Sequence, residues 1–85
     1  MNVLEKILQF PPGYSEAVYN NRKYSVLRRD FNNHKSIKLY AQELGGKDFI
    51  SCNLYITETK QLLKPCEMPE QKVIRFLSNC QLLTS

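Results

Sequence analysis

The chain of 85 residues contains no tryptophan, one histidine and three glycines, and it has no long apolar run. A membrane-spanning helix needs roughly 18 consecutive apolar residues, so no membrane association is expected. The first residues lack a basic segment followed by an apolar one, which argues against a secretory signal. The three cysteines form no C-x-x-C pair. We therefore expect reduced thiols and a cytoplasmic location.

The composition is that of a folded domain with an uneven charge distribution. Hydrophobic residues make up 42% and charged residues 24% of the chain, and five tyrosines and four phenylalanines supply bulk for a core. At this length we expect a single domain over residues 1–85. The formal charge of +4 is concentrated between Asn20 and Lys38, where six basic residues accompany one acidic residue, Asp30.

The spacing of apolar residues changes along the chain. Spacings of three and four predict an amphipathic helix over residues 2–9, which Pro11-Pro12-Gly13 ends. Alternation from Tyr14 onward, with asparagine and glycine turns, predicts strands over residues 14–19, 22–31, 36–44, 49–57 and 61–64. Residues 69–77 predict a closing helix that begins at a proline and whose apolar stripe continues to Cys80.

These elements predict an α+β fold: a two-layer domain with an antiparallel, four- to five-stranded meander and with the N-terminal and C-terminal helices on one face. A two-residue turn at Gly45-Gly46 places Leu39 opposite Cys52 and makes every pair on that face of the hairpin apolar. In the strand over residues 22–31 both faces are partly apolar. We expect an even-numbered loop after this strand, which assigns Tyr24 and Val26 to the core.

Three segments carry a resemblance to known proteins: Phe10-Pro11-Pro12-Gly13-Tyr14-Ser15-Glu16, Leu44-Gly45-Gly46-Lys47-Asp48-Phe49 and Lys64-Pro65-Cys66-Glu67-Met68-Pro69. They resemble segments of a family of small, uncharacterised bacterial proteins that sometimes carry the label peptide methionine sulfoxide reductase. The resemblance covers nearly the whole chain and implies a stand-alone domain in a bacterial cytoplasm, without an established activity. The motifs do not support the label. The chain lacks the tryptophan-containing nucleophile motif of one reductase class and the paired zinc cysteines of the other.

Cys66 is the candidate for thiol chemistry. It stands just ahead of the closing helix, where free amides and the positive end of the helix dipole favour a thiolate. Lys64 adds positive charge nearby, whereas Glu67 and Glu70 oppose it. The alternative interpretation is a half-buried structural cysteine. The other two thiols, those of Cys52 and Cys80, are assigned to the core.

No pattern in the sequence predicts a catalytic, metal or cofactor site. His34 and the three cysteines are ligand types for zinc, but the cysteines stand fourteen residues apart, and zinc knuckles pair ligands two to four residues apart. Gly45-Gly46-Lys47 is too short for a P-loop and leads into a strand. The carboxylates form no pair that the sequence establishes, so the sequence favours a non-enzymatic protein without deciding the question, and no cofactor is expected.

One face of the sheet is expected to lack a covering layer, because two short helices cannot cover both faces. We expect this face to carry Leu27, Arg29, Phe31, Lys38, Tyr40, Phe49 and Tyr55. Aromatic and arginine side chains are favoured at the centres of interfaces, and large exposed apolar patches mark them. The leading hypothesis is therefore a non-enzymatic interaction or accessory domain that forms a homodimer or binds an unidentified protein partner through this face.

Two alternatives from other functional classes stay open. The first is a thiol-dependent redox protein that uses Cys66. The second is nucleic-acid binding through the basic strands of residues 22–38, with cations that can neutralise phosphates and interleaved rings that can stack on bases. These cations are Arg22, Arg28, Arg29, Lys35 and Lys38. The order of elements does not match an RNA-recognition motif, which has a helix after its first strand.

Overall fold

Six antiparallel strands and two helices make up the part of the chain that the computed structural model describes, residues 2–83. The elements in chain order are α1 (Val3–Leu8), β1 (Gly13–Tyr19), β2 (Arg22–Phe31), β3 (Ser36–Glu43), β4 (Phe49–Ile56), β5 (Gln61–Pro65), α2 (Glu70–Asn79) and β6 (Gln81–Leu83). The strand order across the sheet is β5-β4-β3-β2-β1-β6. Strands β1–β5 therefore form a meander, and β6 returns to the outer edge of β1.

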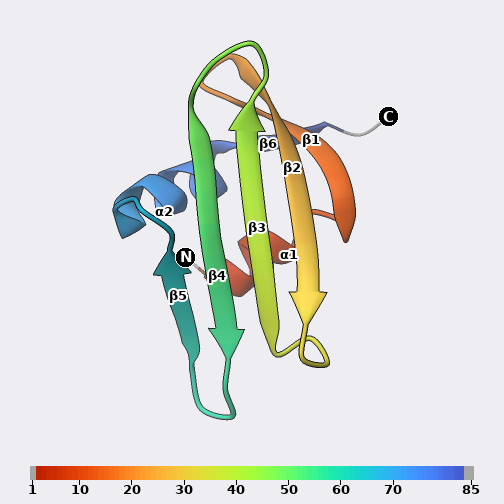
Figure 1. Cartoon of the computed structure of the whole chain (residues 1–85), viewed down its shortest axis with the longest axis vertical. Coiled ribbons are helices and arrows are strands. Elements are labelled where there is room, and N and C mark those ends of the chain that lie inside the picture. The colour runs from red at the N-terminus through yellow and green to blue at the C-terminus, as the bar shows by residue number, and fades with distance from the viewer. Residues whose placement is uncertain (1, 84–85) are drawn as a thin grey trace.

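The helices share one side of the sheet. In Figure 1 the long strands β2, β3 and β4 face the viewer, and both helices lie behind them. Ile7 of α1 and Phe76 of α2 are fully buried against Leu39 of β3, Ile50 of β4 and the other members of one hydrophobic cluster. The predicted α+β arrangement with an antiparallel sheet is confirmed in outline. The number of strands, six within residues 2–83, exceeds the predicted four to five.

The register of the central hairpin is the one that the glycine turn predicted. Leu39 lies opposite Cys52, and both side chains are buried in the core. The assignment of β2 is confirmed as well, because Tyr24 and Val26 are buried whereas Leu27 lies on the opposite face. A one-residue slip would expose an entire row of core side chains, which explains why the apolar pattern determines the register.

Asparagines set the two turns that flank β2. Asn20 and Asn21 have φ values of 53° and 61°. Both central residues of a type I′ hairpin turn need positive φ, and asparagine tolerates it better than most residues. After β2 the loop again has positive φ at Asn32, Asn33 and His34. With Lys35 this loop has four residues, the even number that directs Tyr24 of β2 to the core.

The turn between β3 and β4 closes around the carboxyl group of Glu43. Arg22 donates to this carboxylate and lowers the pKa of Glu43, and the backbone N–H of Asp48 donates to it at 3.3 Å. A Cβ atom at Gly46 would collide with the same carboxyl group. Gly45 has a φ of 78°. Glycine is thus favoured at the two positions for different reasons: positive φ at Gly45 and the close approach of a carboxylate at Gly46.

Arg28 anchors the segment that joins α1 to β1. Its guanidinium group is buried, donates to Asp30 at 3.0 and 2.8 Å, and donates to the carbonyl oxygen of Phe10 at 2.7 Å. Pro11-Pro12 ends the helix, and Gly13 enters β1 with a φ of 88°. The buried pair therefore connects the helix layer to the middle of the sheet.

The C-terminal part differs from the sequence prediction. Helix α2 ends at Asn79, and Cys80 has extended backbone (φ −75°, ψ 155°), so Cys80 does not continue the helical stripe as predicted. The next three residues form β6, which was not predicted, with Leu82 opposite Ala17 of β1. The physical reason is the free edge of β1, whose backbone groups need hydrogen-bond partners. Three residues are too few for an alternating pattern to reveal a strand.

Candidate binding face

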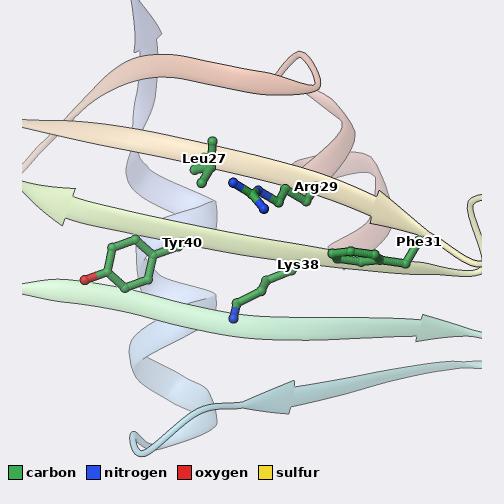
Figure 2. Close-up of a pocket in the computed structure, with 5 residues that line it drawn as sticks. All are labelled: Leu27, Arg29, Phe31, Lys38 and Tyr40. Atoms are coloured by element: carbon green, nitrogen blue, oxygen red, sulfur yellow. The ribbon is translucent and has the colours of Figure 1, made fainter.

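The candidate site is the face of the sheet opposite the helices, here called the open face. The side chains of Leu27, Arg29 and Phe31 on β2 and of Lys38 and Tyr40 on β3 line a depression of about 280 Å³ on it. Figure 2 shows these five side chains on the side of the sheet that α2 does not cover. They reach the same face because side chains alternate along each strand.

Three cations lie in one row across the open face. Arg29 is the direct cross-strand neighbour of Lys38, Lys38 pairs with Asn53, and Asn53 pairs with Lys64. We call Arg29, Lys38 and Lys64 the cation row. It crosses three strand spacings, about 14 Å. The ion pairs within residues 2–83 involve other side chains, so the row has no acidic partner there. Like charges directly opposite one another destabilise a sheet.

Aromatic side chains border the cation row on both sides. Phe31 and Tyr55 lie on one side, in a single row through Ser36. Tyr14 lies on the other side, opposite Leu27, with Tyr40 one strand further on. The exposed fractions of Tyr14, Phe31 and Tyr55 are 62%, 48% and 42%. Large rings on both flanks of a row of cations give this face apolar area and positive charge together.

The structure brings all seven side chains predicted for the uncovered face onto it. Phe49 stacks on Tyr40 with ring centroids 6.1 Å apart, and Lys72 of α2 lies 5.7 Å from the centroid of the Phe49 ring. Phe49 is therefore shielded, whereas Tyr55 is open to solvent. The face that Phe49 and Tyr55 share with the five lining residues follows from the hairpin register.

Two residues of this face, Tyr14 and Lys64, were missed. The two-residue Asn20-Asn21 turn implies the pairing of Tyr14 with Leu27, so a signal for Tyr14 was present. For Lys64 the sequence assigned a three-residue turn before β5. The backbone N–H of Thr57 donates to the carbonyl oxygen of Lys60 at 2.8 Å, so these two residues pair across a two-residue turn, Glu58-Thr59. That count places Lys64 on the open face.

The cation set predicted for nucleic-acid binding is wrong in part. Arg22 binds Glu43, and Arg28 is buried with Asp30 on the helix side of the sheet. Lys35 lies in the loop after β2. Of the five predicted cations, only Arg29 and Lys38 lie on the open face, because neighbouring residues of a strand point to opposite sides.

Cys66 lies half-buried directly after β5, outside the depression. Its backbone N–H donates to the carbonyl oxygen of Ser51 at 2.9 Å, and the side-chain amide of Asn53 donates to its Sγ at 3.5 Å. Neither partner is a base or a cation, whereas a cysteine is activated by a nearby cation, an imidazole or a helix N-terminus. Neither hydrogen bond activates the thiol, and the bond from the backbone N–H extends the β4–β5 ladder by one residue.

The thiols are expected to differ in reactivity. Burial raises the pKa of Cys52 to about 12 and that of Cys80 to about 11, and both side chains are buried. We expect iodoacetamide at about pH 8 to modify Cys66 first in the native protein, because the thiolate is the reactive form. Peptide mapping by mass spectrometry after a time course measures this. Equal labelling of all three thiols in denaturant is the control, and earlier native labelling of Cys52 or Cys80 would contradict their burial.

A second polar cluster joins α2 to the sheet. Asp48 accepts from the hydroxyl group of Tyr24 and from Lys72, each at 2.7 Å. Burial alone would raise the pKa of Asp48, but the hydrogen bonds from Lys72 and Tyr24 outweigh it and lower the pKa. Burial raises the pKa of Tyr24. Asp48 is thus ionised and Tyr24 is protonated, the states in which Asp48 can accept from Tyr24 and from Lys72 of α2.

The three segments that carry the family resemblance have structural roles. One contains Phe10, whose carbonyl oxygen binds Arg28, and another forms the turn around Glu43. The third contains Glu67 with a φ of 61° and Pro69 at the N-cap of α2. Within residues 2–83 no group of histidine, cysteine and acidic side chains has the arrangement of a metal site, and no helix is long and apolar enough to span a membrane.

Comparisons of the chain with protein-family models, with curated proteins and with solved structures found no match. The resemblance to a bacterial family therefore stays a prediction.

Proposed function

We propose that this protein is a non-enzymatic binding domain that holds a macromolecular partner on its open face. The observation that carries this proposal is the cation row, in which Arg29 and Lys38 lie side by side without an acidic partner among residues 2–83. Folding alone disfavours such a pair. Local features that oppose stability are typical of functional sites, where a partner supplies the missing interaction.

The aromatic side chains support the same proposal. Phe31 and Tyr55 are about half exposed on a face that both helices leave free. Aromatic rings and arginine are the residue types enriched at the centres of interfaces. A cytoplasmic location is part of the proposal, and its support is that all three cysteines are free thiols.

A second copy of the chain is the alternative occupant of the open face. The exposed rings of Phe31 and Tyr55 favour it, because they would bury apolar area in a face-to-face dimer. The cation row opposes it, because the two rows would approach one another. Glu16, the acidic residue in the middle of β1, already accepts from Tyr14 and lies 3.9 Å from Lys23. Sedimentation showing a monomer at high micromolar concentration removes this alternative.

The substitution Lys38→Glu tests whether the cation row serves folding. We expect it to raise the free energy of unfolding by up to about 1 kcal/mol, because a glutamate opposite Arg29 replaces repulsion by attraction. Urea denaturation at low ionic strength measures the gain, which shrinks as salt screens the pair. Lys47→Glu in the β3–β4 loop makes the same charge change and is the matched control. A clear loss of stability in Lys38→Glu would show that Lys38 serves the fold and would remove the basis of the proposal.

A further inference from the structure

The cation row and its aromatic flanks together define the chemistry of the partner, and this inference rests on the binding function proposed above. We propose that the open face binds single-stranded nucleic acid, which crosses β2–β5 with its phosphates along Arg29, Lys38 and Lys64. The bases then lie against the flanking rings.

The charge of the open face fits a polyanion. The cation row presents three positive charges over about 14 Å, within the strands of a hydrogen-bonded sheet that fixes their spacing. Phosphates neutralise such cations and release counterions, which drives binding at low salt. Arg29 adds a planar guanidinium group that can donate two parallel hydrogen bonds to one phosphate. A bound polyanion therefore relieves the repulsion between Arg29 and Lys38, and this relief favours binding.

The rings distinguish a single strand from other polyanions. Single-strand binding surfaces combine a basic track with aromatic rings on which successive bases stack. The open face has Phe31 and Tyr55 on one flank of the cation row and Tyr14 and Tyr40 on the other. A duplex keeps its bases stacked inside, and its grooves admit a protruding helix or ribbon, which this face does not present. An acidic peptide would satisfy the cations and leave the rings without stacking partners.

The cation row itself offers little that can read a base sequence. Asn53, the amide that lies between Lys38 and Lys64, donates to the Sγ of Cys66. Rings and cations contact any base and any phosphate. Binding is therefore expected to depend weakly on sequence and strongly on salt.

Fluorescence anisotropy with a labelled oligothymidylate of about 12 nucleotides, within the site sizes of single-strand binding surfaces, tests the charge contribution. Each neutralised phosphate contributes about −0.7 to the slope of log K against log salt, so three cations give a slope of about −2. We expect Lys38→Glu to weaken binding by about tenfold or more and to make the slope shallower. Lys47→Glu, with the same change in net charge, is expected to change the affinity by less than about threefold.

Substitution of the rings tests the stacking contribution separately. We expect Phe31→Ala and Tyr55→Ala each to weaken binding by about fivefold or more with the salt slope unchanged. Leu44→Ala removes an equally exposed apolar side chain from the β3–β4 loop and is expected to leave the affinity unchanged. Circular dichroism of every variant confirms that the domain is folded, as expected for exposed positions.

Unlabelled polyglutamate and duplex DNA in the same assay separate the two proposals. Tighter binding of polyglutamate or duplex than of the oligothymidylate, lost in Lys38→Glu, would overturn the single-strand inference and leave the open face as the binding surface. Failure of the oligothymidylate to bind at low salt would overturn the inference as well. Binding by both Lys38→Glu and Tyr55→Ala that is as tight as binding by the wild type would place the nucleic acid elsewhere and overturn the single-strand inference.

Discussion

The substitution Leu39→Ala is expected to lower the free energy of unfolding by about 2–4 kcal/mol, because truncating a buried leucine loses transfer free energy and leaves a cavity. Leu39 is fully buried in β3, one of the two central strands of the sheet, between Arg28 of β2 and Cys52 of β4. A domain of this size has a stability of roughly 5–10 kcal/mol, so a large part of it depends on this side chain. Urea denaturation followed by circular dichroism measures the change.

The matched control makes the same chemical change at an exposed site. Leu44 is 45% exposed in the loop after β3, and Leu44→Ala is expected to change the stability by less than about 0.5 kcal/mol. Similar losses in both variants would contradict the register in which Leu39 faces the core.

The substitution Arg28→Met is expected to cost about 3 kcal/mol at neutral pH, because it leaves the largely buried carboxylate of Asp30 without its arginine partner. The side chains of Arg28 and Asp30 are 9% and 11% exposed. The substitution also removes the hydrogen bond to the carbonyl oxygen of Phe10. Thermal or urea denaturation measures the loss.

The loss is expected to depend on pH. The hydrogen bond from Arg28 lowers the pKa of Asp30 from its ordinary value of 3.8, with a further contribution from His34. A carboxyl group whose pKa is lowered by folding stabilises the native state above its unfolded pKa, and this stabilisation is lost as the pH falls through the folded pKa. The difference between wild type and Arg28→Met is therefore complete at neutral pH and narrows below about pH 4.

The double variant Arg28→Met with Asp30→Asn is the control, since it removes the unpaired charge and is expected to recover part of the stability at neutral pH. Unchanged stability in Arg28→Met would contradict the structural role of the pair and return Arg28 to the set of available cations.

The sequence predicts the central part of the fold well, because the number of residues in a short turn determines which residues of the two strands pair. The Gly45-Gly46 turn and the apolar alternation together leave one acceptable pairing of Leu39, and that pairing is observed. The same reasoning explains β2, where a four-residue loop directs Val26 inward. These features depend on local geometry, which a sequence displays directly.

Features that depend on tertiary contacts were harder to predict. Strand β6 has three residues and exists because α2 returns the chain to the edge of β1. The basic stretch of β2 pointed to both Arg28 and Arg29, and only Arg29 lies on the open face. Asp30, two residues from Arg28 on the same side of the strand, was the available signal that Arg28 is paired. Prediction of the cation row required the register of β5, and the three-residue turn expected before β5 gave the wrong register.

Amide chemical-shift mapping of the isotope-labelled protein during titration with oligothymidylate tests the central claim most directly. We expect the shift changes to concentrate in β2–β5 around Arg29, Lys38 and Lys64, with α1 and α2 unaffected behind the sheet. Shift changes concentrated in the helices, or none on the open face at saturating oligonucleotide, would contradict the claim that this face binds a single strand.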